Sequence, residues 1–402
     1  ISNESFFEPL TNVIQYLKVR GTWGQVGNSQ ISGRRFAYLA TVTDSSSTSY
    51  TFGKNMDQNY GTTAIDEYAV DVTWEVADKT DIGVDMRLLN NKLNLQFDYF
   101  KESREGIYLR RSSIPSYVGM INNPYGNIGK VENKGFELSV NYANSWGGDW
   151  SLSLMGNYSF NRNKVLEDDS TVVYPWQNTI GNKVGQRFGL VALGLFESYG
   201  EIAASPVQTG DTRPGDIKYK DINGDGKIDE YDKVPIGWGS VPEIMYGFGF
   251  SVGWKNLSLT AMFQGAAHVD AMLSGEGVLP FSQGSSRGNL LSNITDRWTE
   301  ENPRQNAFYP RLSIGNINMN YEESTWWLKD TDYLRLKNIE LSYRLPDHWM
   351  KRIHLDNARI FIQGVNLLTF SSFKIWDVEL GDGRGARYPN IASVSLGVNF
   401  NF

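Results

Sequence analysis

The sequence predicts an all-β protein, a transmembrane antiparallel β-barrel with long loops. Apolar and polar residues alternate strictly through several segments that are long enough to cross a bilayer as tilted strands. The connections between these segments alternate between short turns and long loops, which is typical of barrels in the bacterial outer membrane. No run of about 18 apolar residues is present, so a spanning helix is excluded, whereas a spanning barrel is not.

The clearest single strand is the last one, residues 392–402. One row of its side chains is apolar and the other consists of Ser, Gly and Asn, so the two faces of the strand differ in polarity. Strands of soluble sheets also alternate, but they are usually about 5 to 6 residues long, whereas crossing a bilayer takes about 9 to 11 residues. We therefore predict that the chain ends on a spanning strand. Its apolar row is Val394, Leu396, Val398, Phe400 and Phe402.

From the N-terminus, the first alternating segment covers residues 16–25. Leu17, Val19 and Trp23 lie on one row, and Lys18 and Arg20 lie on the other. Residues 28–78 are irregular and rich in Ser, Thr, Asp and Tyr. We expect a long loop there, with short strands around residues 36–42 and 68–76.

Four pairs of strands follow this loop. The first pair turns at Asn90 and Asn91, residues that tolerate the positive φ of a tight hairpin, and the third turns at Lys255 and Asn256. Alternation in the fourth pair slips near Asn338, as a β-bulge would make it. The pairs are residues 80–88 with 93–99, 136–142 with 152–160, 244–252 with 257–263, and 332–345 with 358–369.

Ten spanning strands result from this count. Residues 184–196 also resemble a strand, but an eleventh crossing would break the alternation of turns and loops, so we assign them to a loop excursion or to half of an unrecognised pair. An even count places the C-terminus in the periplasm and the long loops outside the cell. The strands lie near residues 16, 80, 93, 132, 150, 244, 257, 333, 358 and 393, and the long loops cover about residues 27–78, 102–130, 162–243, 266–331 and 370–391.

Charged and aromatic side chains follow the same pattern. A Lys or Arg on the lipid face at the bilayer midplane costs roughly 2 to 4 kcal/mol, so charges are expected on the opposite row. Aromatic residues are expected near strand ends, where they form girdles. The charges on the opposite row include Asp81, Asp85, Arg87, Asp98 and Glu137, and the aromatic residues near strand ends are Trp23, Trp146, Trp150, Trp254 and Tyr142.

Composition excludes several other classes. The 402 residues carry a formal charge of -7, so no basic surface is available for nucleic acid. No Cys is present, which removes disulfides, thiolate metal sites and cysteine nucleophiles. The chain starts at Ile1 with no targeting segment, so we expect it to be a piece of a longer or processed protein.

The most specific local motif is an oxygen-rich turn at residues 221–232. Its oxygen side chains occupy positions 1, 3, 5, 9 and 12 of a calcium-binding loop, and Gly226 occupies position 6, where such loops turn sharply. Pro214 and Pro235 argue against the flanking helices of an EF-hand, and an Asx-rich solvated turn is the alternative. We expect a structural calcium ion. Its ligands would be Asp221, Asn223, Asp225, the carbonyl of Lys227, Asp229 and Asp232.

No enzyme site is predicted. Gly247 and Gly249 lie in a strand with no helix after it, so they do not form a phosphate-binding loop. The three His residues, His268, His348 and His354, are scattered and read as surface or loop residues.

Several motifs in order along the chain make the sequence resemble the C-terminal barrel of SusC-type (SusC/RagA) TonB-dependent outer-membrane transporters of Bacteroidetes. The sequence departs from the family at Asp377-Val378-Glu379, where Asp-Pro-Glu is usual. The matching motifs are Leu17-Lys18-Val19-Arg20, Trp23-Gly24, Gly27-Asn28, Asn133-Lys134-Gly135-Phe136-Glu137, Pro214-Gly215-Asp216-Ile217-Lys218-Tyr219, Tyr333-Leu334-Arg335-Leu336-Lys337-Asn338, Asn366-Leu367-Leu368-Thr369, Tyr388-Pro389 and Phe402.

This resemblance implies that residues 1–402 are about ten C-terminal strands of a 22-stranded barrel whose plug domain is absent from this sequence. It implies active import of a large nutrient together with a SusD-like surface lipoprotein. The first expectation for the nutrient is an oligosaccharide, and the second is a peptide. Further implied partners are the TonB complex, contacted by the missing N-terminal region, outer-membrane lipid, and the barrel-assembly machinery, which would recognise Phe402. A dimer of transporter–lipoprotein pairs is also implied.

Two alternatives are a passive porin and a non-transporting outer-membrane surface or scaffold protein. For import of a glycan, exposed aromatic residues in the loops could stack on sugar rings. The candidates are Trp176, Trp238, Trp326 and Trp376.

Overall fold

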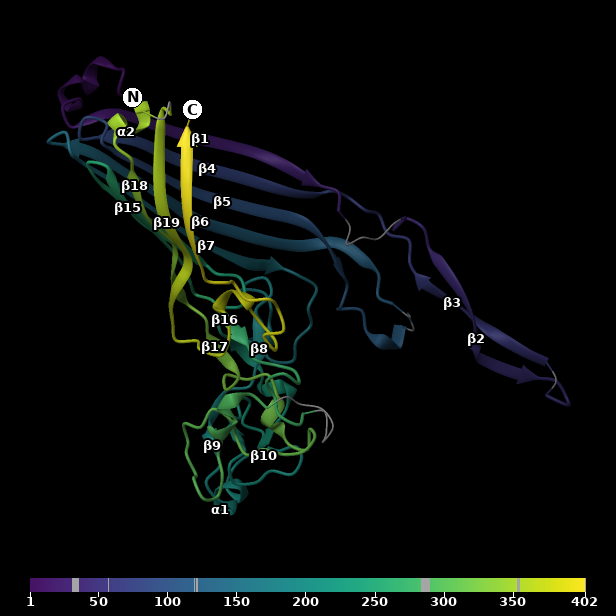
Figure 1. Cartoon of the computed structure of the whole chain (residues 1–402). Helices are drawn as coiled ribbons and strands as arrows, with labels where there is room; N and C mark the ends of the chain where they lie inside the picture. Colours follow the sequence, from purple (N-terminus) through teal and green to yellow (C-terminus); the bar gives the residue numbers. More distant parts are fainter. Residues whose placement is uncertain are drawn as a thin grey trace.

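The protein is built around one antiparallel sheet of ten strands (Figure 1). The computed structural model describes residues 1–30, 36–56, 58–118, 120, 122–282, 290–352 and 355–401. Strands adjacent in the sheet are also consecutive among these ten, so the sheet is a simple meander, and all ten predicted strands are confirmed. They are β1 (Ile14–Asn28), β4 (Glu75–Leu88), β5 (Leu93–Arg110), β6 (Tyr125–Trp146), β7 (Trp150–Glu167), β14 (Ile244–Trp254), β15 (Leu257–Ala267), β18 (Tyr333–Arg344), β19 (Asn357–Ser371) and β20 (Ser393–Asn401).

Short turns join the strands at one end of the sheet, and both chain termini lie at this end (Figure 1). The predicted turn chemistry is confirmed, because Asn90, Asn91 and Lys255 all have positive φ. The longer connection between β18 and β19 contains helix α2 (Asp347–Arg352). The opposite end, which we call the long-loop end, carries every long connection.

The register explains the slip predicted near Asn338. In the pairing of β15 with β18, the adjacent residues Met262 and Phe263 pair with Asn338 and Leu336, so Lys337 is the extra residue of a bulge. The pairing of β18 with β19 shifts at the same level, between Leu336 and Asn338, and there β19 carries the extra residue.

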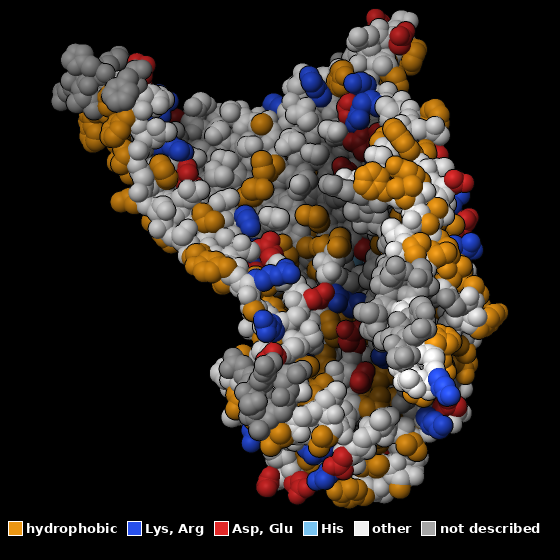
Figure 2. Space-filling view, turned by 90° about the vertical axis from the view of Figure 1, so that its right-hand side faces the viewer, with side chains coloured by type: hydrophobic (Ala, Val, Ile, Leu, Met, Phe, Trp, Pro, Cys, Tyr) orange, Lys and Arg blue, Asp and Glu red, His pale blue; other side chains and the backbone are white. Residues whose placement is uncertain are grey.

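The two faces of the sheet differ in polarity as the alternation predicts. Val394 and Leu396 of β20 are 64% and 78% exposed, so the apolar face lacks a covering layer in this chain. On the other face, Arg20 reaches Asp85 at 3.1 Å and Asp98 at 2.6 Å from two neighbouring strands. The space-filling view shows acidic and basic side chains gathered in a hollow of the molecule (Figure 2). We call these two sides of the sheet the apolar face and the polar face.

Aromatic residues form a row near the short turns. Trp146 pairs with Trp150 across β6 and β7, and Trp150 pairs with Trp254 across β7 and β14. The ring centroids of Trp150 and Trp254 are 6.0 Å apart. This row agrees with the predicted girdle.

The long-loop ends of several strands extend further than predicted. The loop predicted at residues 102–130 is shorter, because β5 continues to Arg110 and β6 begins at Tyr125. Cross-strand ion pairs stabilise this extension, including Lys101–Glu132 at 2.7 Å and Lys130–Glu105 at 2.5 Å. Alternation alone does not reveal a strand that continues with charges on both rows.

The loop between β1 and β4 was also predicted wrongly in detail. Its strands are β2 (Thr41–Phe52) and β3 (Gln58–Glu67), which form a separate hairpin that projects from the sheet (Figure 1). The short strands predicted around residues 36–42 and 68–76 fall mostly in turns and irregular segments. The Ser- and Thr-rich run lacks a clear apolar period, so the sequence did not reveal this hairpin.

The long loops after β7, β15 and β19 pack together into a body at the long-loop end (Figure 1). We call the described residues of 168–243, 268–332 and 372–391 the loop body. Its core contains Leu190, Ile217, Tyr219, Tyr309 and Trp327, each at most 1% exposed. Its strands are β8 (Arg187–Gly189), β9 (Ala192–Leu195), β10 (Val207–Gln208), β11 (Ile217–Tyr219), β12 (Lys227–Ile228), β13 (Val234–Ile236), β16 (Asp270–Met272) and β17 (Leu328–Asp330).

Residues 184–196 belong to the loop body. They contain β8 and β9, which pair with β13 and β11 and not with the main sheet. The prediction that this segment lies outside the spanning strands is therefore confirmed.

Helices are short. Among the described residues, none is long and apolar enough to cross a membrane. Besides α2, they are η1 (Ser5–Leu10), η2 (Ser116–Val118), η3 (Pro175–Gln177), α1 (Tyr199–Ala203), η4 (Glu230–Asp232), η5 (Ser292–Thr295), η6 (Met319–Tyr321) and η7 (Val378–Leu380).

Candidate functional site

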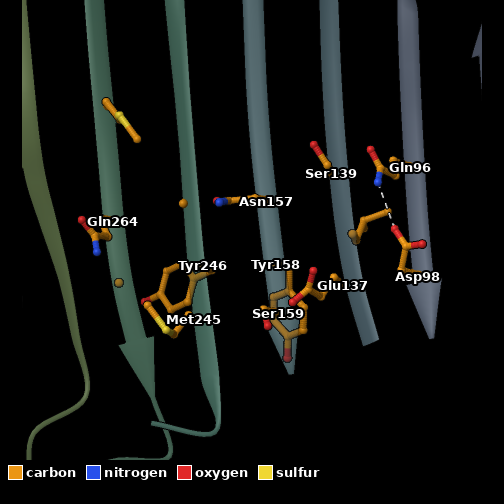
Figure 3. Close-up of a pocket in the computed structure, with 14 residues that line it drawn as sticks. Gln96, Asp98, Glu137, Ser139, Asn157, Tyr158, Ser159, Met245, Tyr246 and Gln264 are labelled. Carbon is orange, nitrogen blue, oxygen red and sulfur yellow. Dashed lines mark hydrogen bonds between the residues drawn. The ribbon is translucent and has the colours of Figure 1, made fainter. Parts of the chain in front are cut away.

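The polar face holds a cleft of about 680 Å³ that crosses β5, β6, β7, β14 and β15 (Figure 3). Alternation places a small or polar side chain of each strand on this face. The side-chain amide of Gln96 donates to the Asp98 carboxylate at 3.0 Å, while the other labelled groups come from β6, β7, β14 and β15. A wall of hydroxyl, amide and carboxylate groups suits a water-filled passage. Its polar members are Gln96, Asp98, Glu137, Ser139, Asn157, Ser159 and Gln264.

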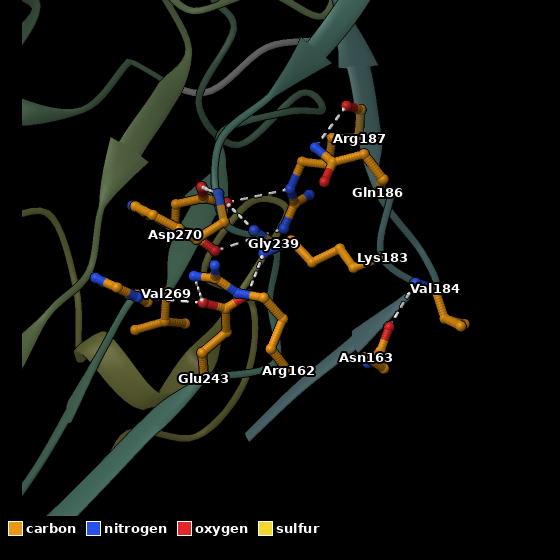
Figure 4. A network of polar contacts seen from close by, with 12 residues as sticks. Arg162, Asn163, Lys183, Val184, Gln186, Arg187, Gly239, Glu243, Val269 and Asp270 are labelled. Carbon is orange, nitrogen blue, oxygen red and sulfur yellow. Dashed lines mark hydrogen bonds and ion pairs between the residues drawn. The ribbon is translucent and has the colours of Figure 1, made fainter. Parts of the chain in front are cut away.

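A buried carboxylate, Glu243, directly precedes β14 at the long-loop end of the sheet (Figure 4). Arg162 of β7 donates to both of its oxygens, at 3.1 and 2.7 Å, and the Lys183 ammonium lies 3.4 Å away. His268 Nδ1 is 3.1 Å from Glu243 Oε2. One side chain thus ties the ends of β7 and β14 to the loop body.

The electrostatics of Glu243 follow from these contacts. Burial acts to raise its pKa, but hydrogen bonds from Arg162 and His268 and the nearby charge of Lys183 outweigh burial, so the net pKa is lowered. The carboxylate is therefore ionised at neutral pH, and it organises the cations around it.

A second acidic residue, Asp270 of β16, fixes the neighbouring turn. Its carboxylate accepts the backbone N–H groups of Trp238 and Gly239 and pairs with Arg187 at 3.2 Å. Arg187 also pairs with Asp382 at 2.8 Å, so it links β8 to the last long loop. These contacts lie side by side with those of Glu243 (Figure 4).

Between this network and the strand ends lies a further cavity of about 700 Å³. Its strand residues belong to the polar face, and the segment 179–188 borders it, with the Val184 N–H donating to Asn163 at 2.7 Å. Arg104 on its rim pairs with Glu75 and Glu102 at 2.8 and 2.7 Å. Apolar side chains interrupt the polar wall here: Ile107, Leu109, Val131, Val165, Val184 and Phe188.

The four predicted Trp side chains are not brought together. Trp176 stacks on Tyr174 at 4.6 Å and donates to the carbonyl of Tyr231, so it packs against the oxygen-rich turn. Trp326 and Trp376 pack against the core of the loop body. Trp238 is 42% exposed, and it stacks on His268 at 3.9 Å with Arg162 and Lys183 within 6 Å of its ring. Of the four, Trp238 alone adjoins the Glu243 network.

In the oxygen-rich turn, the side chains bind backbone groups. Asp221 accepts the N–H groups of Gly224 and Gly226 at 2.6 and 2.9 Å. Asn223 and Asp225 each accept an N–H two residues ahead, at 3.0 and 2.9 Å. The side chains near the start of the turn are therefore held together by the turn itself.

The end of the turn is fixed differently. Asp232 is fully buried, and it accepts the N–H groups of Ile222 and Asp229 at 2.7 and 2.9 Å. Asp229 caps helix η4, and Lys227 begins β12. Within the described part of the chain, no three His, Cys, Asp or Glu side chains form a metal-binding group. The donor set of carboxylate, amide and carbonyl oxygens fits a hard cation, and calcium stays a prediction.

Phe402 lies outside the described residues, so its predicted role in assembly stays a prediction as well. Sequence reasoning missed Glu243, Arg162 and Asp270, and it dismissed His268 as a loop residue. Arg162, Glu243 and the nearby pair His268 and Asp270 come from three separate parts of the sequence and carry no common motif. One signal in the sequence could have indicated this network: Glu243 and Arg162 both lie next to the ends of predicted strands.

Comparisons with known proteins give a consistent result. The sequence profile of one family, described as TonB dependent receptor-like, beta-barrel, matches residues 10–367. The TonB-dependent receptor P3 of Formosa agariphila is 28% identical over 433 residues, which cover 100% of this chain and 41% of that protein. The TonB-dependent receptor SusC of Bacteroides thetaiotaomicron is 25% identical over 420 residues, covering 100% of this chain and 39% of that protein.

Among solved structures, the RagAB peptide transporter superposes with a TM-score of 0.72 at 22% identity. The match covers 100% of this chain and 42% of that chain, and it supports the fold. The chain therefore spans about two fifths of the length of the relatives that it matches.

Proposed function

The chain belongs to the TonB-dependent receptor β-barrel family, and from this premise we propose that it forms part of an outer-membrane transporter that imports a large nutrient. The family consists of receptors and transporters, not enzymes. The observation that carries the proposal is the ten-stranded sheet, with its bare apolar face and a polar wall opposite. A sheet of this kind suits a barrel with lipid outside and water inside.

Energy would come from the TonB complex through the part of the protein that this sequence lacks. The polar wall by itself would also suit a passive porin. Family membership favours active import, because a TonB-dependent receptor couples to TonB. The loop body would be extracellular and the short turns periplasmic, in keeping with outer-membrane barrels.

A SusD-like surface lipoprotein is the proposed partner, and a dimer of such pairs the proposed assembly. Similarity to SusC over the whole of this chain supports this partner. The loop body is the surface that such a lipoprotein would cover, since it lies at the end of the sheet where the long loops gather (Figure 1).

An oligosaccharide remains the first proposed cargo and a peptide the second. Of the four candidate Trp residues, Trp238 is the one whose position supports stacking on a sugar ring. The other three pack within the loop body. The hydroxyl and amide groups of the polar wall also suit a hydroxyl-rich cargo. A peptide stays the second proposed cargo, because the solved structure with a similar fold is described as the RagAB peptide transporter.

Uptake tests this proposal directly. A strain that lacks the gene for the full protein is expected to lose uptake of its large nutrient, and uptake in the complemented strain is expected to stop when TonB is deleted. Uptake that survives loss of TonB would instead identify a porin. Normal uptake without the gene would favour a surface or scaffold protein.

A further inference from the structure

A cavity of about 550 Å³ opens in the loop body, away from the Glu243 network. It lies between β17, the start of helix η5 and the segment that follows β19. Its apolar lining consists of Leu291, Phe308, Phe373 and Ile375. Small polar groups, Ser292, Asn293 and Ser372, line it as well.

Lys329 of β17 gives this cavity its charge. Its ammonium donates to the carbonyl of Trp326 at 2.7 Å and lies 5.2 Å from the centre of the Phe308 ring. Burial lowers the pKa of Lys329, since its charged form has lost part of its hydration. Across the described residues, no carboxylate lies within ion-pair distance of this ammonium.

Lys329 is partly buried, and its ammonium has one hydrogen-bond acceptor among the described residues, the carbonyl of Trp326. An ammonium has three donors, and one carbonyl and one ring face do not replace the hydration that burial removes. Most buried charges in proteins are paired with an opposite charge. An anion that enters the cavity would supply the missing partner.

The other charged residues of the lining also favour an anionic ligand. Lys374 is a second lysine at the cavity. It is exposed to solvent, and it has no ion pair with any residue that the structure describes. One acid, Asp330, also lines the cavity, and its carboxylate accepts the backbone N–H of Asp332 at 2.8 Å. The two lysines therefore outnumber the single acid.

We propose that this cavity binds an acidic sugar residue of the imported cargo, with its carboxylate or sulfate on Lys329 and Lys374. The apolar lining would receive the C–H face of the ring, and Ser292, Asn293 and Ser372 would bind its hydroxyl groups, a division of roles that is common in ligand pockets. The proposal rests on the proposed function, import of a large nutrient, and it narrows the cargo to an acidic oligosaccharide.

Binding to the purified full-length transporter, with its lipoprotein, tests the site. The probes are trigalacturonate, a sulfated carrageenan tetrasaccharide and their neutral counterparts, measured by calorimetry. We expect at least one acidic probe to bind at least about tenfold more tightly than its neutral counterpart, because charge-assisted hydrogen bonds contribute this much. Equal affinity of acidic and neutral probes for the transporter would overturn the proposal.

Two variants separate the site from a general effect of charge. Lys329→Gln and Lys374→Gln are each expected to weaken binding of the acidic probe by about tenfold, with little change for the neutral one. Lys255→Gln makes the same charge change in a short turn at the opposite end of the sheet, and it is expected to leave binding unchanged. Equal losses in all three variants would contradict a specific site.

Lys329→Gln is not expected to prevent folding, because Lys329 is only partly buried and has no ion pair among the described residues. Lys329→Met is a second variant of similar length, and its thermal unfolding checks that the loop body is intact. A folded Lys329→Met protein that binds the acidic probe like the wild type would overturn the proposal.

The outer leaflet also contains acidic sugars, so a final comparison identifies the source. In cells, Lys329→Gln is expected to reduce uptake of the labelled acidic probe while outer-membrane levels of the transporter stay constant. Tighter binding of purified lipopolysaccharide than of either oligosaccharide would overturn the assignment to cargo. Loss of TonB dependence would instead refute the proposed function, and it would leave the binding result in the purified protein unaffected.

Discussion

Glu243 illustrates how single residues organise the long-loop end. Its carboxylate is 7% exposed and contacts Arg162, Lys183 and His268, which come from three separate parts of the chain. Asp216 has the corresponding role inside the loop body, where it is 1% exposed and binds Arg311 through two hydrogen bonds of 2.9 Å. Among the described residues, Glu243 is the one carboxylate in ion-pair contact with Arg162 and Lys183, and Asp216 is the one in contact with Arg311.

Replacing Glu243 by Gln is expected to destabilise the long-loop end by about 1 to 3 kcal/mol, because Arg162 and Lys183 lose their common counter-charge. The pKa of Glu243 is lowered in the folded protein. Its stabilising effect is therefore complete above the ordinary glutamate pKa of about 4.3, and it is lost as the pH falls through the lower folded value.

Thermal unfolding of the purified transporter and the variant at several pH values measures this difference. Glu137→Gln, on the polar wall, is a matched control with no ion pair among the described residues, and it is expected to change the unfolding temperature little. A Glu243→Gln difference that stays constant from pH 7 down to strongly acidic pH would contradict the assignment.

At the scale of elements, each strand of the sheet presents apolar side chains on one face and polar or small side chains on the other. β20 exposes its apolar row and directs Ser395 and Asn399 to the other side. Register is fixed by this alternation, because a slip by one residue would exchange the two faces. The oxygen-rich turn is an element of another kind, in which backbone hydrogen bonds hold the side chains together.

Leu396→Arg places a charge on the apolar face near the middle of β20, and it is expected to cost roughly 2 to 4 kcal/mol in the membrane. Ser395→Arg, one residue earlier, faces the polar side and is expected to cost far less. The amount of folded protein in outer-membrane fractions measures both effects. Equal losses for the two variants would show that β20 does not face lipid on the Leu396 side.

If the oxygen-rich turn binds calcium, chelation is expected to increase proteolysis near residues 221–232. At a free calcium concentration of about 100 times the dissociation constant, bound calcium would stabilise the folded turn by about 2.7 kcal/mol. Removal of calcium would lose that stabilisation. Asp221→Ala is expected to abolish the effect of the chelator. Metal analysis that finds no calcium in the purified wild-type transporter would refute this prediction.

At the scale of the whole molecule, β1 and β20 stand at the two ends of the sheet order. Their outer edges carry backbone groups that need partners in a membrane, where water cannot satisfy them. The chain spans about two fifths of the length of its relatives, so we infer that the remaining strands of such a barrel pair with these edges.

Residues 1–402 alone, refolded in detergent, are therefore not expected to form the compact species that resists unfolding in SDS without heating. The full-length protein, treated in the same way, is expected to form it. Both are compared by electrophoresis before and after heating. A heat-modifiable band from residues 1–402 alone would show that ten strands close a barrel by themselves.

The sequence by itself determined the ten strands, their order, their short turns and the polarity of their faces. These properties depend on local alternation and turn residues such as Asn90 and Lys255, which are visible in one segment at a time. Tertiary structure decided how the loops pack. Glu243 meets Arg162 across 81 positions, and Asp216 meets Arg311 across 95, contacts that no local pattern encodes. The same reason explains why three predicted sugar-stacking Trp residues pack inside the loop body, and why Lys329 and Lys374 line one cavity.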